Sequence, residues 1–187
     1  MSKANKHITA GLLHIEVIGQ VPERPPGRQG RSPKRQPTSL AQQFYNDKCS
    51  WRELELVTAA NFGRQALVIT QTYDNDHLPK DRVEANRFFQ KFVRKLRSAR
   101  KLRGAELKYI YVTEGFHEKR ENDWLEGDGS LEDRRFHHHV IINTTGADDL
   151  EEIRSLWQGG GYIRAEPLDV HYYRELAKYM TKEAREF

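Results

Sequence analysis

The sequence has a single cysteine, Cys49, and no long run of apolar residues. One cysteine cannot form a disulfide within the chain, which is typical of proteins kept in a reducing compartment. No stretch approaches the ~20 apolar residues that a membrane-spanning helix needs. The polar N-terminus also lacks the apolar run of a signal peptide. These absences predict a cytoplasmic protein with no membrane partner.

Acidic residues are missing from two basic stretches, although the formal net charge is only +4. Residues 91–103 include seven Lys/Arg and residues 24–35 include five, and neither stretch has an Asp or Glu. Such stretches can neutralise phosphates, but a solvated helix face or linker gives the same pattern. The candidate DNA contacts are Arg94, Lys95, Arg97, Arg100, Lys101, Arg103 and Lys178.

Large apolar residues are also missing between Val21 and Leu40, where prolines alternate with Gly, Arg and Gln. Such a segment cannot bury a face, so we expect an extended, basic, Pro-rich linker over about 20–39. A strand is expected before it, over 12–18, and a helical segment after it, over 40–61. Residues 1–65 therefore form an N-terminal extension, and 66–187 form the main domain, because 187 residues suit one domain with a core.

The main domain alternates strand and helix patterns. Asp81 is expected at the start of the first helix, as an N-cap or first-turn acid. The predicted strands are 66–73, 106–114, 135–144 and 162–168, the helices begin near 81, 148 and 170, and a long loop covers 115–133. Two βαβ halves of this kind predict an α+β fold, with a ferredoxin-like or RRM-like antiparallel sheet and helices on one face.

Three consecutive histidines lie inside one predicted strand, in the sequence FHHHVIIN. Side chains alternate between the faces of a strand, so His137 and His139 point the same way and His138 points to the other face. Two imidazoles on one face can chelate a divalent ion. Packed or exposed histidines are the simpler alternative, but burying both without a partner is costly.

Glu114 is the candidate third ligand, because it ends the preceding predicted strand. If the two strands pair as an antiparallel hairpin, Glu114 lies at the same end of the sheet as His137 and His139. A carboxylate with two imidazoles suits Mg²⁺ or Mn²⁺ acting on phosphate oxygens. His117 and Glu118 are nearby rivals for this role.

The last predicted helix contains Tyr179 and Lys182, which share a helix face because they are three residues apart. A tyrosine oxygen can form a covalent link to phosphate. A free phenol has a pKa of about 10, so it needs help at neutral pH, which a metal or a nearby lysine can give. A packing stripe that includes Tyr172, Leu176 and Tyr179 is the structural alternative.

Together these motifs resemble the HUH endonucleases, and in particular the rolling-circle replication initiators of phages, small plasmids and single-stranded DNA viruses. In that family a strand carries two histidines, an upstream residue completes the metal site, and a downstream helix carries a nucleophilic tyrosine with a lysine one turn later. Strand 67–73 also resembles the family's first motif. The matching residues are Glu114, His137, His139, Tyr179 and Lys182.

The resemblance implies a metal-dependent enzyme that nicks and rejoins single-stranded DNA or an origin hairpin. Tyr179 would form a 5′-phosphotyrosyl link, and a host helicase or polymerase would extend the free 3′-hydroxyl. Two positions depart from the family pattern. His138 replaces an aliphatic residue, and Glu175 stands where many phage initiators have a second tyrosine, which makes a two-tyrosine mechanism doubtful and leaves Tyr172 as an outside candidate.

Two alternatives remain open. A single-tyrosine HUH transposase has the same motif order and the same chemistry. A non-catalytic RRM-like module has the same strand order and binds bases on strand aromatics, and Tyr109 and Tyr111 share one face of a predicted strand. Such a module has no need for a histidine pair or for a Tyr-x-x-Lys helix.

Overall fold

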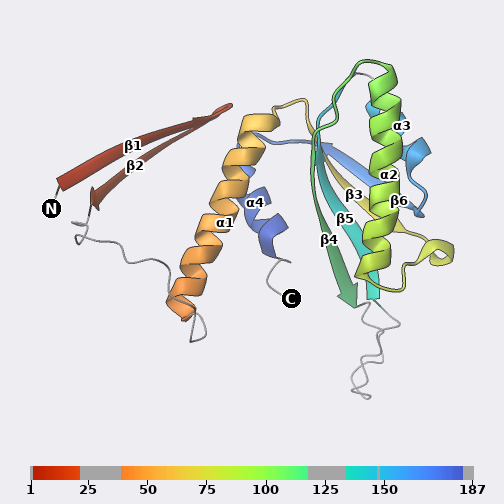
Figure 1. The fold of residues 1–187 in the computed structure, drawn as a ribbon, viewed down its shortest axis with the longest axis horizontal. Helices are drawn as coiled ribbons and strands as arrows, with labels where there is room; N and C mark the ends of the chain where they lie inside the picture. The colour runs from red at the N-terminus through yellow and green to blue at the C-terminus, as the bar shows by residue number, and fades with distance from the viewer. Residues whose placement is uncertain (1, 22–38, 118–133, 147, 183–187) are drawn as a thin grey trace, which may run out of the picture.

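The computed structural model describes residues 2–21, 39–117, 134–146 and 148–182 of the chain (Figure 1). The elements are β1 (Ser2–Ala10), β2 (Leu13–Val21), α1 (Leu40–Asn61), β3 (Leu67–Tyr73), the short 3-10 helix η1 (Asn75–His77), α2 (Arg82–Leu102), β4 (Tyr109–His117), β5 (Arg134–Ile142), α3 (Asp149–Leu156), β6 (Gly160–Pro167) and α4 (Tyr173–Lys182). The expected linker lies almost entirely outside the described residues.

The main sheet has the strand order β4-β5-β3-β6, and each neighbouring pair is antiparallel. The two central strands, β5 and β3, are therefore separated along the chain by α2 and β4. This is the connectivity of two interleaved βαβ units. The predicted α+β class with a ferredoxin-like antiparallel sheet is confirmed.

One face of the sheet is covered by α2 and α3, as Figure 1 shows and as expected for the two βαβ helices. Asp81 is the N-cap of α2, and its side chain accepts a hydrogen bond from the Glu84 N–H at 2.7 Å. The buried side of α2 follows helical spacing and packs on Ile69, Val140 and neighbouring strand residues. Its buried apolar residues are Ala85, Phe89, Phe92, Val93 and Leu96.

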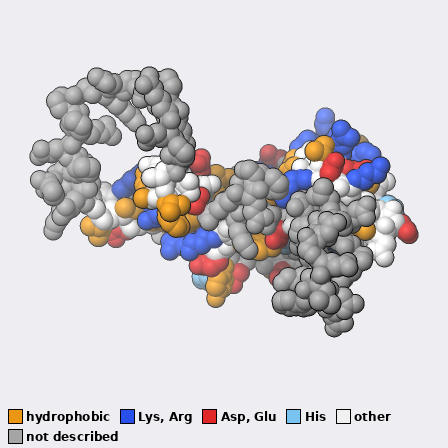
Figure 2. Space-filling model, turned by 90° about the horizontal axis from the view of Figure 1, so that it is seen from below, with side chains coloured by type: hydrophobic (Ala, Val, Ile, Leu, Met, Phe, Trp, Pro, Cys, Tyr) orange, Lys and Arg blue, Asp and Glu red, His pale blue; other side chains and the backbone are white. Residues whose placement is uncertain are grey.

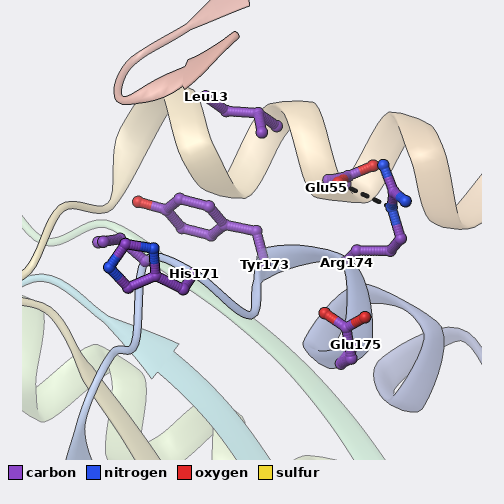
Figure 3. Close-up of a pocket in the computed structure, with 7 residues that line it drawn as sticks. Leu13, Glu55, His171, Tyr173, Arg174 and Glu175 are labelled. Carbon is purple, nitrogen blue, oxygen red and sulfur yellow. Dashed lines mark hydrogen bonds and ion pairs between the residues drawn. The ribbon is translucent and has the colours of Figure 1, made fainter. Parts of the chain in front are cut away.

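The opposite face of the sheet is partly covered by α1 and α4, which lie side by side (Figure 1). Phe62, at the end of α1, is buried in the same cluster as Tyr173 and Met180 of α4, and the Tyr173 hydroxyl donates to the Phe62 carbonyl at 2.6 Å. Figure 3 shows a second contact, in which Arg174 Nε donates to Glu55 Oε1 at 3.3 Å. The domain boundary at residue 66 stays a prediction, but α1 packs against the helix that carries Tyr179.

Two features of the chain differ from the sequence expectation. The strand expected over 12–18 is β2, and it pairs with β1, which was not expected. Gly11, at φ +55°, allows the tight turn between them and lies against the Ala59 carbonyl, where a Cβ would not fit. The predicted loop also starts too early, because β4 continues to His117; residues 118–133 lie outside the described part. Within the described ranges, no helix has the length and apolar character to cross a membrane.

Candidate metal and nucleophile site

The strand pleat separates the three histidines of β5. Phe136, His138 and Val140 face α2, whereas His137 and His139 face the side of α4, together with Ile141. This follows from the period of two along a strand. The apolar residues that must be buried under α2 therefore fix the direction in which the two outer histidines point.

Strand register brings Glu114 to the histidine pair. Glu114 of β4 is the direct cross-strand partner of His137, and antiparallel partners have Cβ atoms about 4.5–5.5 Å apart. Glu114 Oε2 lies 2.9 Å from His137 Nε2 and 3.0 Å from His139 Nε2. One ligand atom from each of the three residues falls within 4.8 Å of the others. The expected hairpin geometry of this trio is present.

Tyr179 of α4 reaches the same three residues from above the sheet. Its hydroxyl donates to Glu114 Oε2 at 2.8 Å and lies 2.7 Å from His139 Nε2. The phenol ring stands edge-on to the His139 imidazole, with ring centroids 4.9 Å apart. The oxygen that the sequence nominates as a nucleophile is therefore in contact with the residues that the sequence nominates as metal ligands.

The protonation states of this cluster suit a cation. Burial acts to raise the pKa of Glu114, but hydrogen bonds from Tyr179 and His139 outweigh it, so this pKa lies below its ordinary value. Burial and the neighbouring charge of His137 lower the pKa of His139. At neutral pH the carboxylate is therefore ionised and the imidazole of His139 is neutral, which are the forms that bind a metal. The trio could hold a divalent ion, with a donor set of one oxygen and two nitrogens.

Thr70 of β3 contacts the far side of the His139 ring. It is the cross-strand partner of His139, and its Oγ1 lies 3.2 Å from His139 Nδ1. When Nδ1–H donates to this hydroxyl, the lone pair of Nε2 points to Glu114 and is available to a metal. Outer partners of this kind fix the tautomer of metal-binding histidines. Sequence reasoning missed Thr70, because the pairing of β3 with β5 cannot be read from either strand alone.

His138 faces the core, as the sequence predicts. Its Nε2 lies 2.6 Å from the Tyr73 hydroxyl and its Nδ1 lies 2.9 Å from Thr113 Oγ1, so both ring nitrogens have partners. Burial, with the charges of the two flanking histidines, lowers the pKa of His138 to about 3. His138 is therefore a neutral core residue, and its ring lies on the other side of the sheet from Glu114.

Arg100 and Arg103 were expected to contact DNA, and the structure gives them structural partners instead. Arg100 is completely buried, and its guanidinium lies 3.0 Å from Asp149 and 3.6 Å from Glu152. The prediction for Arg100 is wrong, because a side chain with no exposed surface cannot reach a phosphate. Arg103 is half exposed and makes two hydrogen bonds to Glu152, at 2.7 and 2.9 Å.

The other basic candidates do not gather at the metal cluster. Lys178 of α4 places its ammonium 5.2 Å from the centre of the Trp51 ring of α1. Lys182 is the last residue of α4, and its side chain lies outside the described part, as do the side chain of His117 and all of Glu118. The remaining four are exposed on α2, across the sheet from Tyr179: Arg94, Lys95, Arg97 and Lys101.

Two exposed residues of the edge strand β6 lie on the same face as the cluster. Arg164 pairs with Thr70, which pairs with His139, so the three form one row across adjacent strands. With strands about 4.8 Å apart, Arg164 stands about 10 Å from His139. Tyr162, two residues before it, is 70% exposed. Sequence reasoning missed both, because a single cation and a single tyrosine in a short strand carry no signal.

Tyr109 and Tyr111 do not form an open base-stacking surface. Both pack against Phe89 of α2, and the Tyr111 and Phe89 rings are stacked with centroids 4.1 Å apart. The interpretation of these residues as RRM-type contacts is wrong, because α2 covers that face of β4.

Fold and site together define a ferredoxin-like α+β domain with a Glu-His-His cluster and a tyrosine in contact with it. Residues 66–184 match the family of replication-associated proteins of the ORF2 type. The match covers well over half of the chain, so the chain belongs to this family and its role is in DNA replication, which involves contact with nucleic acid.

No curated protein matches the chain at a significant level. Among solved structures, the hypothetical protein ORF119 from Sulfolobus islandicus rod-shaped virus 1 is similar to this chain. The two are 18% identical with a TM-score of 0.41, over 65% of this chain and 84% of that one.

Proposed function

We propose that this protein is an HUH-type endonuclease that nicks and rejoins single-stranded DNA to initiate rolling-circle replication. The observation that carries the proposal is the contact of the Tyr179 hydroxyl with Glu114 and His139 at 2.8 and 2.7 Å. A packing tyrosine does not need this position, whereas a nucleophile beside a metal does. The family match favours a replication initiator over a transposase with the same motifs.

Glu114, His137 and His139 would hold Mg²⁺ or Mn²⁺, and the ion would polarise a phosphate oxygen when bound. Tyr179 Oη attacks the phosphorus, and the bond from phosphorus to the 3′ oxygen breaks. The 3′ oxygen takes up a proton and leaves as a hydroxyl, while the 5′ phosphate stays on the tyrosine. The phenolic proton passes to an acceptor beside it, and Glu114 Oε2 and His139 Nε2 are the acceptors in contact. Attack by the 3′-hydroxyl on this link reverses the reaction and rejoins the strand.

The single strand would lie across the part of the sheet next to the cluster. Arg164, in the same cross-strand row as His139, can neutralise a neighbouring phosphate. Tyr162 offers an exposed ring on which a base can stack, a contact worth about 1–3 kcal/mol per base. Lys182, one turn after Tyr179, is proposed to offset phosphate charge.

The test is the covalent adduct between protein and DNA. Labelled single-stranded origin DNA is incubated with Mn²⁺ or with EDTA and resolved on a denaturing gel. We expect an Mn²⁺-dependent adduct that Tyr179→Phe abolishes and Tyr172→Phe leaves unchanged. Tyr172 is the matched control, because it is exposed and precedes the first residue of α4. An adduct that survives Tyr179→Phe overturns the assignment of the nucleophile, and origin DNA bound without cleavage in any metal overturns the enzyme.

A further inference from the structure

The outer side of α2 carries a row of exposed cations. Arg87, Lys91, Arg94 and Lys101 follow one another at intervals of four, three and seven residues, so they lie along one line of the helix. Lys95 and Arg97 flank this line and are exposed too. The opposite side of α2 is the apolar face packed on the sheet. We call these six residues the α2 row.

The α2 row lacks counter-charges. No Asp or Glu occurs between Ala85 and Ala105, and in the described part of the chain no side chain of the row makes an ion pair or a hydrogen bond. Lys91 is the exception to full solvation, because its ammonium lies 5.6 Å from the centre of the Phe88 ring. Like charges three or four residues apart destabilise a helix by about 0.2–0.5 kcal/mol per pair. An anionic partner would relieve this repulsion.

The dimensions of the row fit a phosphate backbone. From Arg87 to Lys101 the helix rises about 21 Å, at 1.5 Å per residue, which equals about six phosphates of one strand at 3.4 Å each. The row has no exposed aromatic ring on which an unpaired base could stack; Phe88 is half-buried and packs edge-on against Tyr73. Contacts to backbone without stacking suit a duplex better than a single strand.

The row also lies on the wrong side of the sheet for the strand at Tyr179. In Figure 1, α2 and α3 cover one face of the sheet and α4 lies over the other. Figure 2 shows Lys and Arg side chains gathered at the end of the molecule that carries α2. A nucleotide at the metal cluster is therefore separated from the row by the sheet and the core beneath α2.

We propose that the α2 row binds the phosphate backbone of double-stranded DNA while the other face of the sheet holds a single strand. The second half of this statement rests on the proposed function, and the first half does not. At a replication origin the two ligands would be a paired segment and the unpaired segment next to it.

The first experiment measures binding of a labelled 20-base-pair duplex in EDTA at several salt concentrations, so that no cleavage is involved. The variant is Arg87→Gln with Arg94→Gln and Lys101→Gln; glutamine keeps good helix propensity. The slope of log affinity against log salt should flatten by about 2.7, because each lost phosphate contact removes about 0.9. The control removes three exposed cations elsewhere: Lys6→Gln, Lys48→Gln and Arg64→Gln. An unchanged slope in the α2 variant, or an equal loss in the control, overturns the proposal.

The second experiment uses the unaltered chain and asks whether both DNA forms bind together. A saturating short single strand is added to the complex with labelled duplex. Two separate surfaces predict a change in duplex affinity below about twofold, because the coupling free energy between them is small. Displacement of the duplex overturns the two-surface arrangement. Neither experiment depends on nicking, so a failure of the proposed enzyme activity is seen separately in the adduct assay.

Discussion

Replacing Thr70 with valine should weaken metal binding without unfolding the protein. Valine keeps the β-branched shape that suits the middle of a sheet, but it cannot accept the hydrogen bond from His139 Nδ1–H, which spans 3.2 Å in the structure. The ring then loses the partner that holds its proton on Nδ1 and leaves Nε2 free. Loss of such an outer partner typically lowers metal affinity by about 10- to 100-fold, or about 1.4 to 2.7 kcal/mol.

The assay is calorimetric titration of Mn²⁺ into the protein at pH 7, with Thr72→Val as the matched control. Thr72 is the next outward-facing residue of β3, and its hydroxyl donates to the Tyr162 carbonyl at 3.0 Å instead of to a histidine. The control should bind Mn²⁺ like the unaltered chain. If Thr70→Val binds Mn²⁺ with full affinity, or if Thr72→Val loses as much, the tautomer argument is refuted.

Two further predictions concern stability. Because the pKa of His138 is about 3 in the folded protein and about 6.5 in an unfolded chain, the unfolded state takes up the proton first as the pH falls. In EDTA, the free energy of unfolding should therefore drop by about 2 kcal/mol between pH 7 and pH 5, as measured by urea unfolding, and His138→Leu should show a clearly smaller drop. Asp149→Ala should cost about 3 kcal/mol, because it removes the closest counter-charge of the buried Arg100 and leaves only Glu152 at 3.6 Å; a loss below about 1 kcal/mol in urea unfolding would contradict that pairing.

The candidate cluster could be predicted because each of its parts has a local signal. His137 and His139 are separated by the strand period, Glu114 ends the neighbouring strand, and Tyr179 lies on a helix with a clear apolar face. The remaining step was that β4 and β5 pair as a hairpin, and consecutive strands commonly do.

The parts that could not be predicted depend on contacts between distant residues. The burial of Arg100 comes from Asp149, 49 residues later, and a basic helix shows no sign of which arginine turns inward. Gly115 resembles a loop signal, but in β4 it pairs with Phe136, whose ring would lie 2.9 Å from an added Cβ. The glycine makes room for a core side chain and does not end the strand.

The β1 strand was missed for a compositional reason. Its sequence, SKANKHITA, has one large apolar residue, Ile8, so it lacks the alternation that marks a half-buried strand. It forms because β2 pairs with it along its whole length and because Ala10 and Leu13 at the turn pack beside α1. The signal was therefore in the partner strand and in the turn at Gly11.

The run of three histidines gives β5 a choice of register that most strands lack. A slip by one residue moves every side chain to the opposite face, so His138 would point outward alone while His137 and His139 entered the core. Only the native register offers two imidazoles to one ion beside Glu114. Since a ligand stabilises the state that binds it, a divalent cation would select the correct pairing of β4 with β5 among competing alignments. In this strand the same ion that serves the chemistry would also proofread the fold.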